Sequence, residues 1–177
     1  MKRAFMICMA VLFVLIPIYS QDAQTKMDAF LSKTGQIIRF IDYGLPSIKT
    51  DYEYVSVKIR QFEVQGDTKY FYQLSKESKY GTKTSSIEYS DLIEIIKAMD
   101  ALLEKYNEDS KTNFDYMENK FSTEDGFQVG YYKSQKGTKW YMRLEKTGSD
   151  ITVFLSDGNV LKSAFIIGRD KIESMKK

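Results

Sequence analysis

The feature that most constrains this chain is an amphipathic pattern over residues 91–106. Apolar residues recur there at i, i+3, i+4 and i+7, which predicts a helix with a broad apolar stripe. Ser90 is a suitable N-cap, and Asp91 complements the helix dipole in the first turn. Such a stripe must be buried, and strands on either side of the helix in the sequence offer the surface for it.

The residues before this helix are dominated by strand patterns. Residues 54–62 alternate cleanly, with Val55, Val57 and Ile59 on one face, which indicates a half-buried strand. A Gly-containing turn then returns the chain as a hairpin. The predicted strands are 36–42, 54–62, 68–74 and 81–89, with turns at 44–47 and 65–67. Because residues 36–42 are mostly apolar, this strand is expected to be buried on both faces.

A second series of strands follows the helix. The predicted strands are 114–121, 127–132, 138–144, 151–155 and 160–167, and a short closing helix follows Gly168. Asp157-Gly158-Asn159 is expected to be the tight turn before the last strand. Ahead of all the strands, residues 21–34 fit either a short amphipathic helix or a loose leader packed on the domain.

Two stretches of the chain share a pattern. Residues 66–76 and 136–146 each contain a Gly turn, Thr-Lys, two aromatic residues and Leu-x-Lys. A duplicated strands-then-helix unit at 36–106 and 112–177 would explain the match, although amphipathic strands also converge in pattern. With or without duplication, the expected fold class is α+β, with antiparallel sheets and helices packed on one face.

The N-terminus predicts a secretory signal peptide at residues 1–20. Lys2 and Arg3 precede an apolar run of about fifteen residues, which is shorter than the roughly 20 needed to span a membrane. Cleavage is expected after Ser20, with Ala23 as the alternative site and an uncleaved anchor as the alternative role. A single α+β domain at 21–177, without a membrane span, would then be periplasmic or extracellular.

Removal of residues 1–20 changes the chemistry that the chain can perform. Lys2, Arg3 and the single Cys, Cys8, leave together, so the 26 basic residues fall to 24, equal to the number of acidic residues. The mature chain then has neither Cys nor His, which excludes a Ser-His-Asp triad, a Cys nucleophile and a structural zinc site. We therefore expect no cofactor, no metal and no enzymatic activity, and a fold that depends on its packed core.

Four residues are candidates for a binding surface: Lys69, Phe71, Tyr141 and Arg143. They lie at outward positions of the two matching strands, where basic and aromatic residues interleave as on single-stranded nucleic-acid platforms. Two strands-then-helix repeats also resemble, in outline, the DNA-binding folds of the PUR and Whirly proteins. Zero net charge and export argue against nucleic acid, and an ordinary solvated sheet face is the alternative interpretation.

Other residues suggest different functions. A hydrolase could use paired carboxylates such as Asp51 and Glu53, Glu108 and Asp109, or Glu124 and Asp125. Exposed tyrosines such as those at 131–132, 52 and 54 suit a carbohydrate or peptide binder, although tyrosine also fills half-buried strand positions. The leading hypothesis is a non-catalytic exported domain that binds a protein or a glycan through a sheet face or edge.

Three runs of the sequence carry a family resemblance. Residues 18–21, 30–40 and 79–84 resemble small exported proteins of Bacteroidetes-type bacteria. The resemblance includes no catalytic motif, so it assigns a role to no residue. It implies a bacterial periplasmic or secreted setting.

Overall fold

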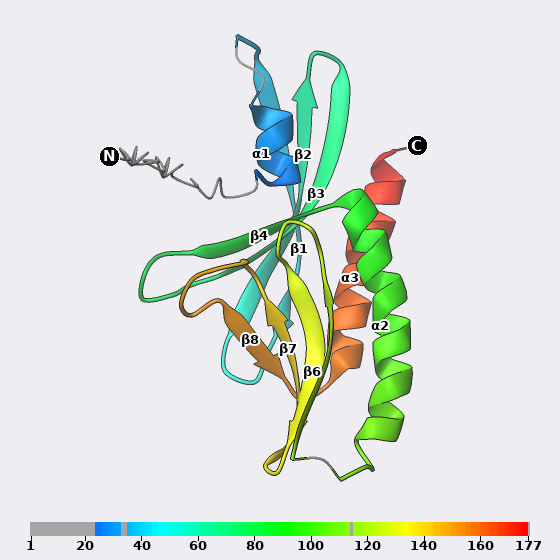
Figure 1. Ribbon diagram of the computed structural model, residues 1–177. Coiled ribbons are helices and arrows are strands. Elements are labelled where there is room, and N and C mark those ends of the chain that lie inside the picture. Colours follow the sequence, from blue (N-terminus) through cyan, green and yellow to red (C-terminus); the bar gives the residue numbers. More distant parts are fainter. Residues whose placement is uncertain (1–23, 33–34, 114, 177) are drawn as a thin grey trace, which may run out of the picture.

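The computed structural model describes residues 24–32, 35–113 and 115–176 of the chain. Within these ranges it contains two four-stranded antiparallel sheets and three helices (Figure 1). The predicted α+β class is therefore confirmed. None of the helices in the described ranges is long and apolar enough to cross a membrane.

The order of elements is four strands followed by a helix, twice. After α1 (Lys26–Leu31), the first series is β1 (Ile38–Lys49), β2 (Tyr54–Val64), β3 (Asp67–Lys76), β4 (Lys83–Glu88) and α2 (Tyr89–Asp109). The second series is β5 (Tyr116–Ser122), β6 (Gln128–Ser134), β7 (Gly137–Arg143), β8 (Thr152–Leu155) and α3 (Gly158–Met175). Each sheet is a simple meander, with every strand paired to the next along the chain. An origin by duplication stays a prediction.

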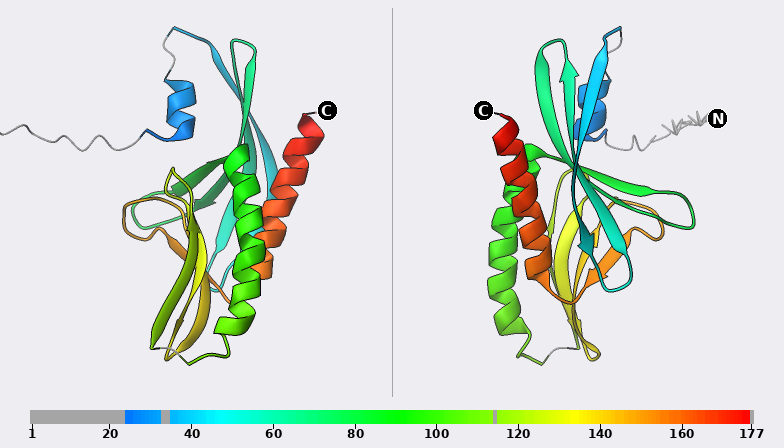
Figure 2. Two further views of the ribbon diagram at one scale, coloured as in Figure 1. Left: turned by 45° about the vertical axis from the view of Figure 1, so that its right-hand side comes forward. Right: turned by 180° about the vertical axis from the view of Figure 1, so that it is seen from behind.

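The two long helices lie side by side and pack on the inner faces of both sheets (Figures 1 and 2). Leu92, Ile95 and Met99, from the predicted stripe of α2, are all fully buried. They join side chains of both sheets and of α3 in one apolar cluster, which includes Ile59, Leu74, Val129, Trp140, Met142 and Phe165. Full burial of each large apolar side chain stabilises the fold by about 2 kcal/mol. The two halves therefore share one core.

Two glycines let α3 approach this core closely. A Cβ at Gly168 would lie 2.4 Å from ring atoms of Tyr72 in the first sheet. A Cβ at Gly158 would lie 2.5 Å from the indole of Trp140 in the second sheet. Both distances are shorter than a carbon–carbon contact, so only glycine fits without displacing a buried ring.

The short helix α1 lies on the opposite face of the first sheet from α2 and α3 (Figure 2). Its Met27 Sδ lies 3.8 Å from Gln73 Nε2 of β3. Phe62, Val64 and Phe71 are buried on this same face of the sheet. The first sheet thus has helices on both faces, an arrangement that the sequence predicted only for one face.

The C-terminal strand prediction is wrong. Residues 160–167 belong to α3, and Asp157 is the N-cap of this helix, because its carboxylate accepts a hydrogen bond from Asn159 N. Leu161, Phe165 and Ile172 point into the core from one side of the helix. A short apolar run fits a strand and a buried helix equally well, and the helical spacing that distinguishes them runs past Gly168.

The start of the first sheet also differs from the prediction. The expected turn at 44–47 lies inside β1, where the register with β2 shifts between Leu45 and Ile48. Pro46 sits in this bulge, which is tolerated because β1 is an edge strand and Pro needs no ladder partner there. The edge position also leaves Phe40 57% exposed, so residues 36–42 are not buried on both faces.

The start of α2 also differs from the prediction. This helix starts one residue before Ser90, with Glu88 as its N-cap.

Candidate binding face

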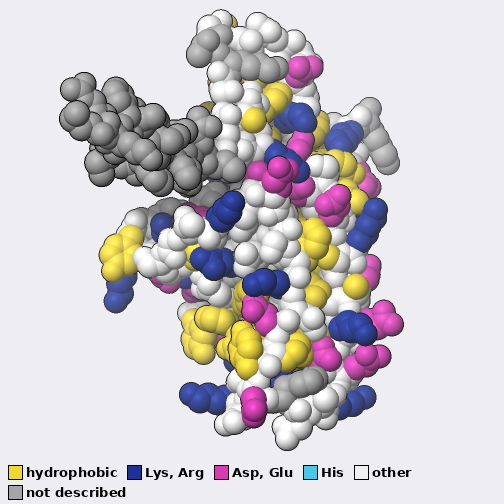
Figure 3. Space-filling model, in the orientation of Figure 1, with side chains coloured by type: hydrophobic (Ala, Val, Ile, Leu, Met, Phe, Trp, Pro, Cys, Tyr) yellow, Lys and Arg dark blue, Asp and Glu magenta, His cyan; other side chains and the backbone are white. Residues whose placement is uncertain are grey.

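The outer face of the second sheet carries four aromatic rings, one from each strand. Strand alternation and register place Tyr116, Tyr132, Tyr141 and Phe154 on the side away from α2 and α3. We call these four residues the aromatic face. In Figure 3, hydrophobic side chains gather over this sheet in the lower left of the molecule.

Tyr132 is the centre of the aromatic face. Its ring lies 6.2 Å from that of Tyr116, and the two planes are within 23° of parallel. The ring of Phe154 stands almost perpendicular to it at 6.3 Å, and that of Tyr141 lies 6.4 Å away. Tyr116 is 63% exposed, whereas Tyr141 is 6% exposed and forms the floor. The face therefore presents flat and upright rings beside one another.

A carboxylate lies among these rings. Glu118 of β5 accepts hydrogen bonds from the hydroxyls of Tyr141 and Tyr116, and Lys120 Nζ is 3.5 Å away. The hydrogen bond from Tyr141 is the main reason that the pKa of Glu118 is below its usual range. Burial, and then the same hydrogen bond, raises the pKa of Tyr141. Glu118 is thus an oriented, ionised acceptor at neutral pH.

A second polar group borders the face beside β8. The turn after β1 is held against this strand because Asp51 N donates to Phe154 O at 3.1 Å. The Asp51 carboxylate lies 2.5 Å from Lys139 Nζ of β7 and accepts from Ser156 Oγ at 2.9 Å. The hydrogen bond to Asp51 chiefly raises the pKa of Lys139, and the nearby tyrosines at 52 and 132 add to it. The turn therefore brings Tyr52, which is highly exposed, to the edge of the aromatic face.

The structure separates the four predicted site residues into two pairs. Tyr141 and Arg143 lie at outer-face positions of β7, where Tyr141 is the buried floor of the aromatic face and not the surface residue that was predicted. Lys69 and Phe71 lie on the first sheet, on the side where α1 packs. Phe71 is fully buried against Phe62, with ring centroids 5.8 Å apart, so its prediction as a surface residue is wrong. Lys69 forms an ion pair with Glu88.

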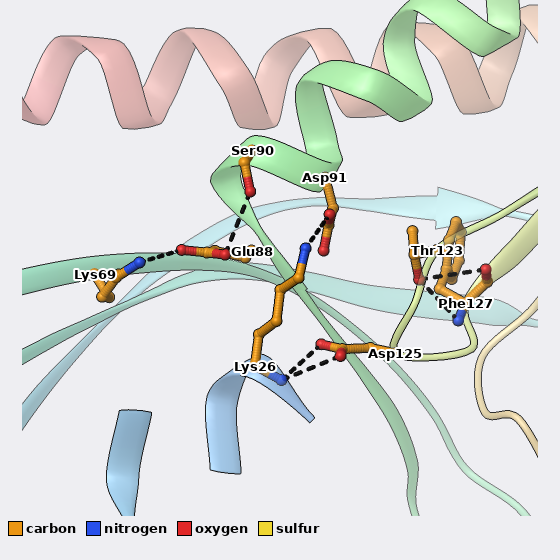
Figure 4. Close-up of polar contacts among 8 residues, drawn as sticks. All are labelled: Lys26, Lys69, Glu88, Ser90, Asp91, Thr123, Asp125 and Phe127. Atoms are coloured by element: carbon orange, nitrogen blue, oxygen red, sulfur yellow. Dashed lines mark hydrogen bonds and ion pairs between the residues drawn. The ribbon is translucent and has the colours of Figure 1, made fainter. Parts of the chain in front are cut away.

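Part of the outer face of the first sheet lies under α1, which is anchored at two points (Figure 4). Lys26 Nζ lies 2.5 Å from the buried carboxylate of Asp91 in α2. The backbone N–H of Lys26 donates to Asp125, in the turn between β5 and β6, at 3.1 Å. Burial raises the pKa of Asp125. Charged residues that are far apart in the sequence hold α1 in place. No pattern within residues 21–34 reveals its partners.

The carboxylates considered for a hydrolase have structural partners. Asp51 binds Lys139, Glu53 lies 2.9 Å from Lys76 Nζ, and Asp109 accepts from Tyr131 Oη at 2.6 Å. Tyr131 is itself buried in the core, although its sequence position suggested a surface ring. Within the described ranges, no group of three potential metal-ligating side chains comes together.

A separate groove of about 540 Å³ lies between the bulge of β1 and α3. Its walls are mainly apolar and include Leu45, Val160 and Ile167. Among its polar side chains, Asp157 accepts through Oδ1 from both the backbone and the side chain of Asn159. The aromatic face combines clustered rings with oriented polar groups, so it is the stronger candidate for specific recognition.

Sequence reasoning missed Tyr116, Glu118 and Phe154. Alternation along β5 indicates only that Tyr116 and Glu118 share one side of that strand. Strand register, which a single sequence does not give, was needed to bring them together. Comparisons with protein-family models, with curated proteins and with solved structures find no match to this chain.

Proposed function

We propose that the chain is a non-catalytic binding domain that contacts its partner through the aromatic face. The observation that carries this proposal is the cluster of Tyr116, Tyr132 and Phe154 around an oriented carboxylate, on a sheet face without a covering helix among the described elements. Rigid aromatic side chains provide contact area at a low entropy cost, and they dominate the energetics of many binding sites.

The chemistry of the chain supports binding more than catalysis. The mature chain contains no imidazole or thiol group. Glu118 and Asp51 have pKa values below their usual range because Tyr141 and Lys139 hydrogen-bond to them, so neither is prepared to act as a general acid near neutral pH. Charged groups that are held in fixed ion pairs suit the binding of a ligand better than the transfer of a proton.

The proposal is tested by mapping contacts on the isotopically labelled protein. Backbone amide NMR spectra would be recorded during titration with separate protein and polysaccharide fractions of a bacterial cell envelope. We expect shift changes at residues 116–120, 130–133, 139–143 and 152–155, and their loss in a Tyr116→Ser/Tyr132→Ser variant. Tyr80→Ser is the control, since this tyrosine is 74% exposed and lies outside the face. Changes confined to another surface, or equal changes in the variant, would contradict the proposal.

The proposed setting is the periplasm or the extracellular space, after removal of residues 1–20. The basic start, the apolar run and Ser20 support this part of the proposal. Expression in a bacterial host followed by N-terminal sequencing of the envelope fraction should give Gln21 or Gln24 as the first residue. A full-length chain confined to the cytosol would exclude export.

A further inference from the structure

The balance of charge on the aromatic face indicates the kind of ligand that it accepts. Two of the three cations described on this face are paired with carboxylates, Lys139 with Asp51 and Lys120 with Glu118, and the third, Arg143, donates to the carbonyl of Lys146. A ligand carrying many charges of one sign would have to separate these pairs, and phosphate groups would meet two ionised carboxylates. The face therefore complements a ligand that is neutral but rich in hydrogen-bonding groups.

The rings add a requirement for flat apolar surfaces on the ligand. Tyr116 and Tyr132 present nearly parallel rings, and Phe154 stands upright beside Tyr132. Sugar rings meet this requirement, because one face of a pyranose exposes mainly C–H groups while its hydroxyls point outward at the rim. The apolar side can pack on an aromatic ring while the hydroxyls reach polar groups around it.

The polar groups lie at the border of the rings, where such hydroxyls would be. Glu118 offers acceptor oxygens on one side of Tyr132, and the Asp51–Lys139–Ser156 group offers both acceptors and donors on the other. The rings extend across strands β5 to β8, a width of about 15 Å at the usual strand spacing. This width suits a chain of sugars better than a single one.

We infer that the aromatic face binds a neutral polysaccharide, with a sugar ring stacked on Tyr132 and its hydroxyls bound by Glu118 and by the Asp51–Lys139 pair. This inference rests on the proposed function and specifies its ligand class. Single-stranded nucleic acid would share the stacking but not the charge balance. A proline-rich peptide would share the aromatic contacts but has few hydroxyls to engage the paired ions.

The test is affinity electrophoresis of the purified chain in native gels containing hydroxyethylcellulose, glucomannan, laminarin or dextran. We expect retardation in at least one gel, and at least roughly tenfold weaker binding for Tyr132→Ala, as for the loss of one stacked ring. Glu118→Gln should also weaken binding, since the ionised acceptor is lost while the side-chain shape is kept. Tyr80→Ala should bind like the parent chain, and circular dichroism verifies that every variant is folded.

Several results would overturn the inference. These are an absence of retardation in all four gels, retardation that Tyr132→Ala leaves unchanged, and binding only to oligo(dT) or to a PxxP peptide in parallel titrations. The NMR map distinguishes failure of the carbohydrate inference from failure of the proposed function. Shift changes on the aromatic face without polysaccharide binding refute the carbohydrate inference alone, whereas changes elsewhere refute the proposed function as well.

Discussion

At the scale of single residues, glycine controls how closely α3 approaches both sheets. Gly158 faces the indole of Trp140 and Gly168 faces the ring of Tyr72, one in each sheet. Neither glycine has a positive φ, so close packing, rather than backbone conformation, explains the requirement for glycine. A residue usually unfavourable inside a helix thus lets one helix join the two halves of the core.

Replacement of Gly168 by alanine should destabilise the protein. The new methyl group would collide with the buried Tyr72 ring, at a cost of about 1–3 kcal/mol, and the higher helix propensity of alanine would offset about 1 kcal/mol of that. Urea denaturation measures the change. Ser163→Ala, at an exposed position of the same helix, is the control and should change stability by less than about 0.5 kcal/mol. A Gly168→Ala variant as stable as the parent would contradict the packing argument.

A second prediction concerns Asp42, which lies between Arg60 and Lys58 on the first sheet. Hydrogen bonds chiefly from Arg60, and also from Lys58, lower the pKa of Asp42 from 3.8 to about 2. Because the folded pKa is the lower one, the contribution of Asp42 to stability is complete above pH ~4 and is lost as the pH falls to ~2.

The variant Asp42→Asn should be less stable than the parent at pH 7 by about 1 kcal/mol, a value reduced for solvent screening of this partly exposed group. The difference in unfolding free energy between parent and variant should shrink below pH 4 and vanish near pH 2. Urea titrations at several pH values measure it. A difference independent of pH would show that the ion pair is not its cause.

At the scale of elements, α1 shows how a short helix is stabilised by distant charges. It has six residues, none of them buried, so packing and propensity alone do not hold it. Lys26 supplies its side chain to Asp91 and its backbone N–H to Asp125. The exposed fraction of the Asp91 side chain is only 8%, so this carboxylate depends on its cation.

A double-mutant cycle of Lys26→Ala and Asp91→Ala should reveal the coupling. Breaking a buried ion pair costs about 3–5 kcal/mol, and since Lys26 is partly hydrated we expect about 2 kcal/mol for Lys26→Ala. The double variant should lose less than the sum of the single losses, with a coupling energy of about 1–2 kcal/mol from urea denaturation. Additive effects would mean that α1 is held by other contacts.

How much could be predicted from sequence also varies with the element. The helix that became α2 and the hairpins of β2, β3, β6 and β7 were predicted because their apolar periodicity is local. α3 was mistaken for a strand because its first half is a short apolar run, and its N-cap sequence imitates a tight turn. Of the four site residues, Tyr141 and Arg143 share the outer face of β7, and their role in binding stays a prediction. Phe71 is buried against Phe62 on the face where α1 packs, and the position of α1 is set by residues far along the chain.

At the scale of the whole molecule, the two sheets share their order of elements but differ in accessibility. One outer face is partly covered by α1, and the other presents the aromatic face. Their inner faces contribute to a single cluster of buried residues together with α2 and α3. The halves should therefore not unfold independently.

Thermal or urea unfolding should accordingly be a single cooperative transition. Trp140, the single tryptophan of the chain, lies in the second sheet and reports on it by fluorescence, whereas far-ultraviolet circular dichroism reports on both sheets and all helices. The two curves should coincide within error. Separate midpoints would indicate that one sheet melts before the other, contrary to a shared core.

The anchoring of α1 also has a consequence for the timing of synthesis. The contact between Lys26 and Asp125 joins residues 99 positions apart. A ribosome produces the donor first, and it must translate most of the remaining domain before the acceptor emerges. During this interval α1 lacks one of its two anchors. Any factor that engages nascent chains thus meets the N-terminal segment well before the folded domain can hold it in place.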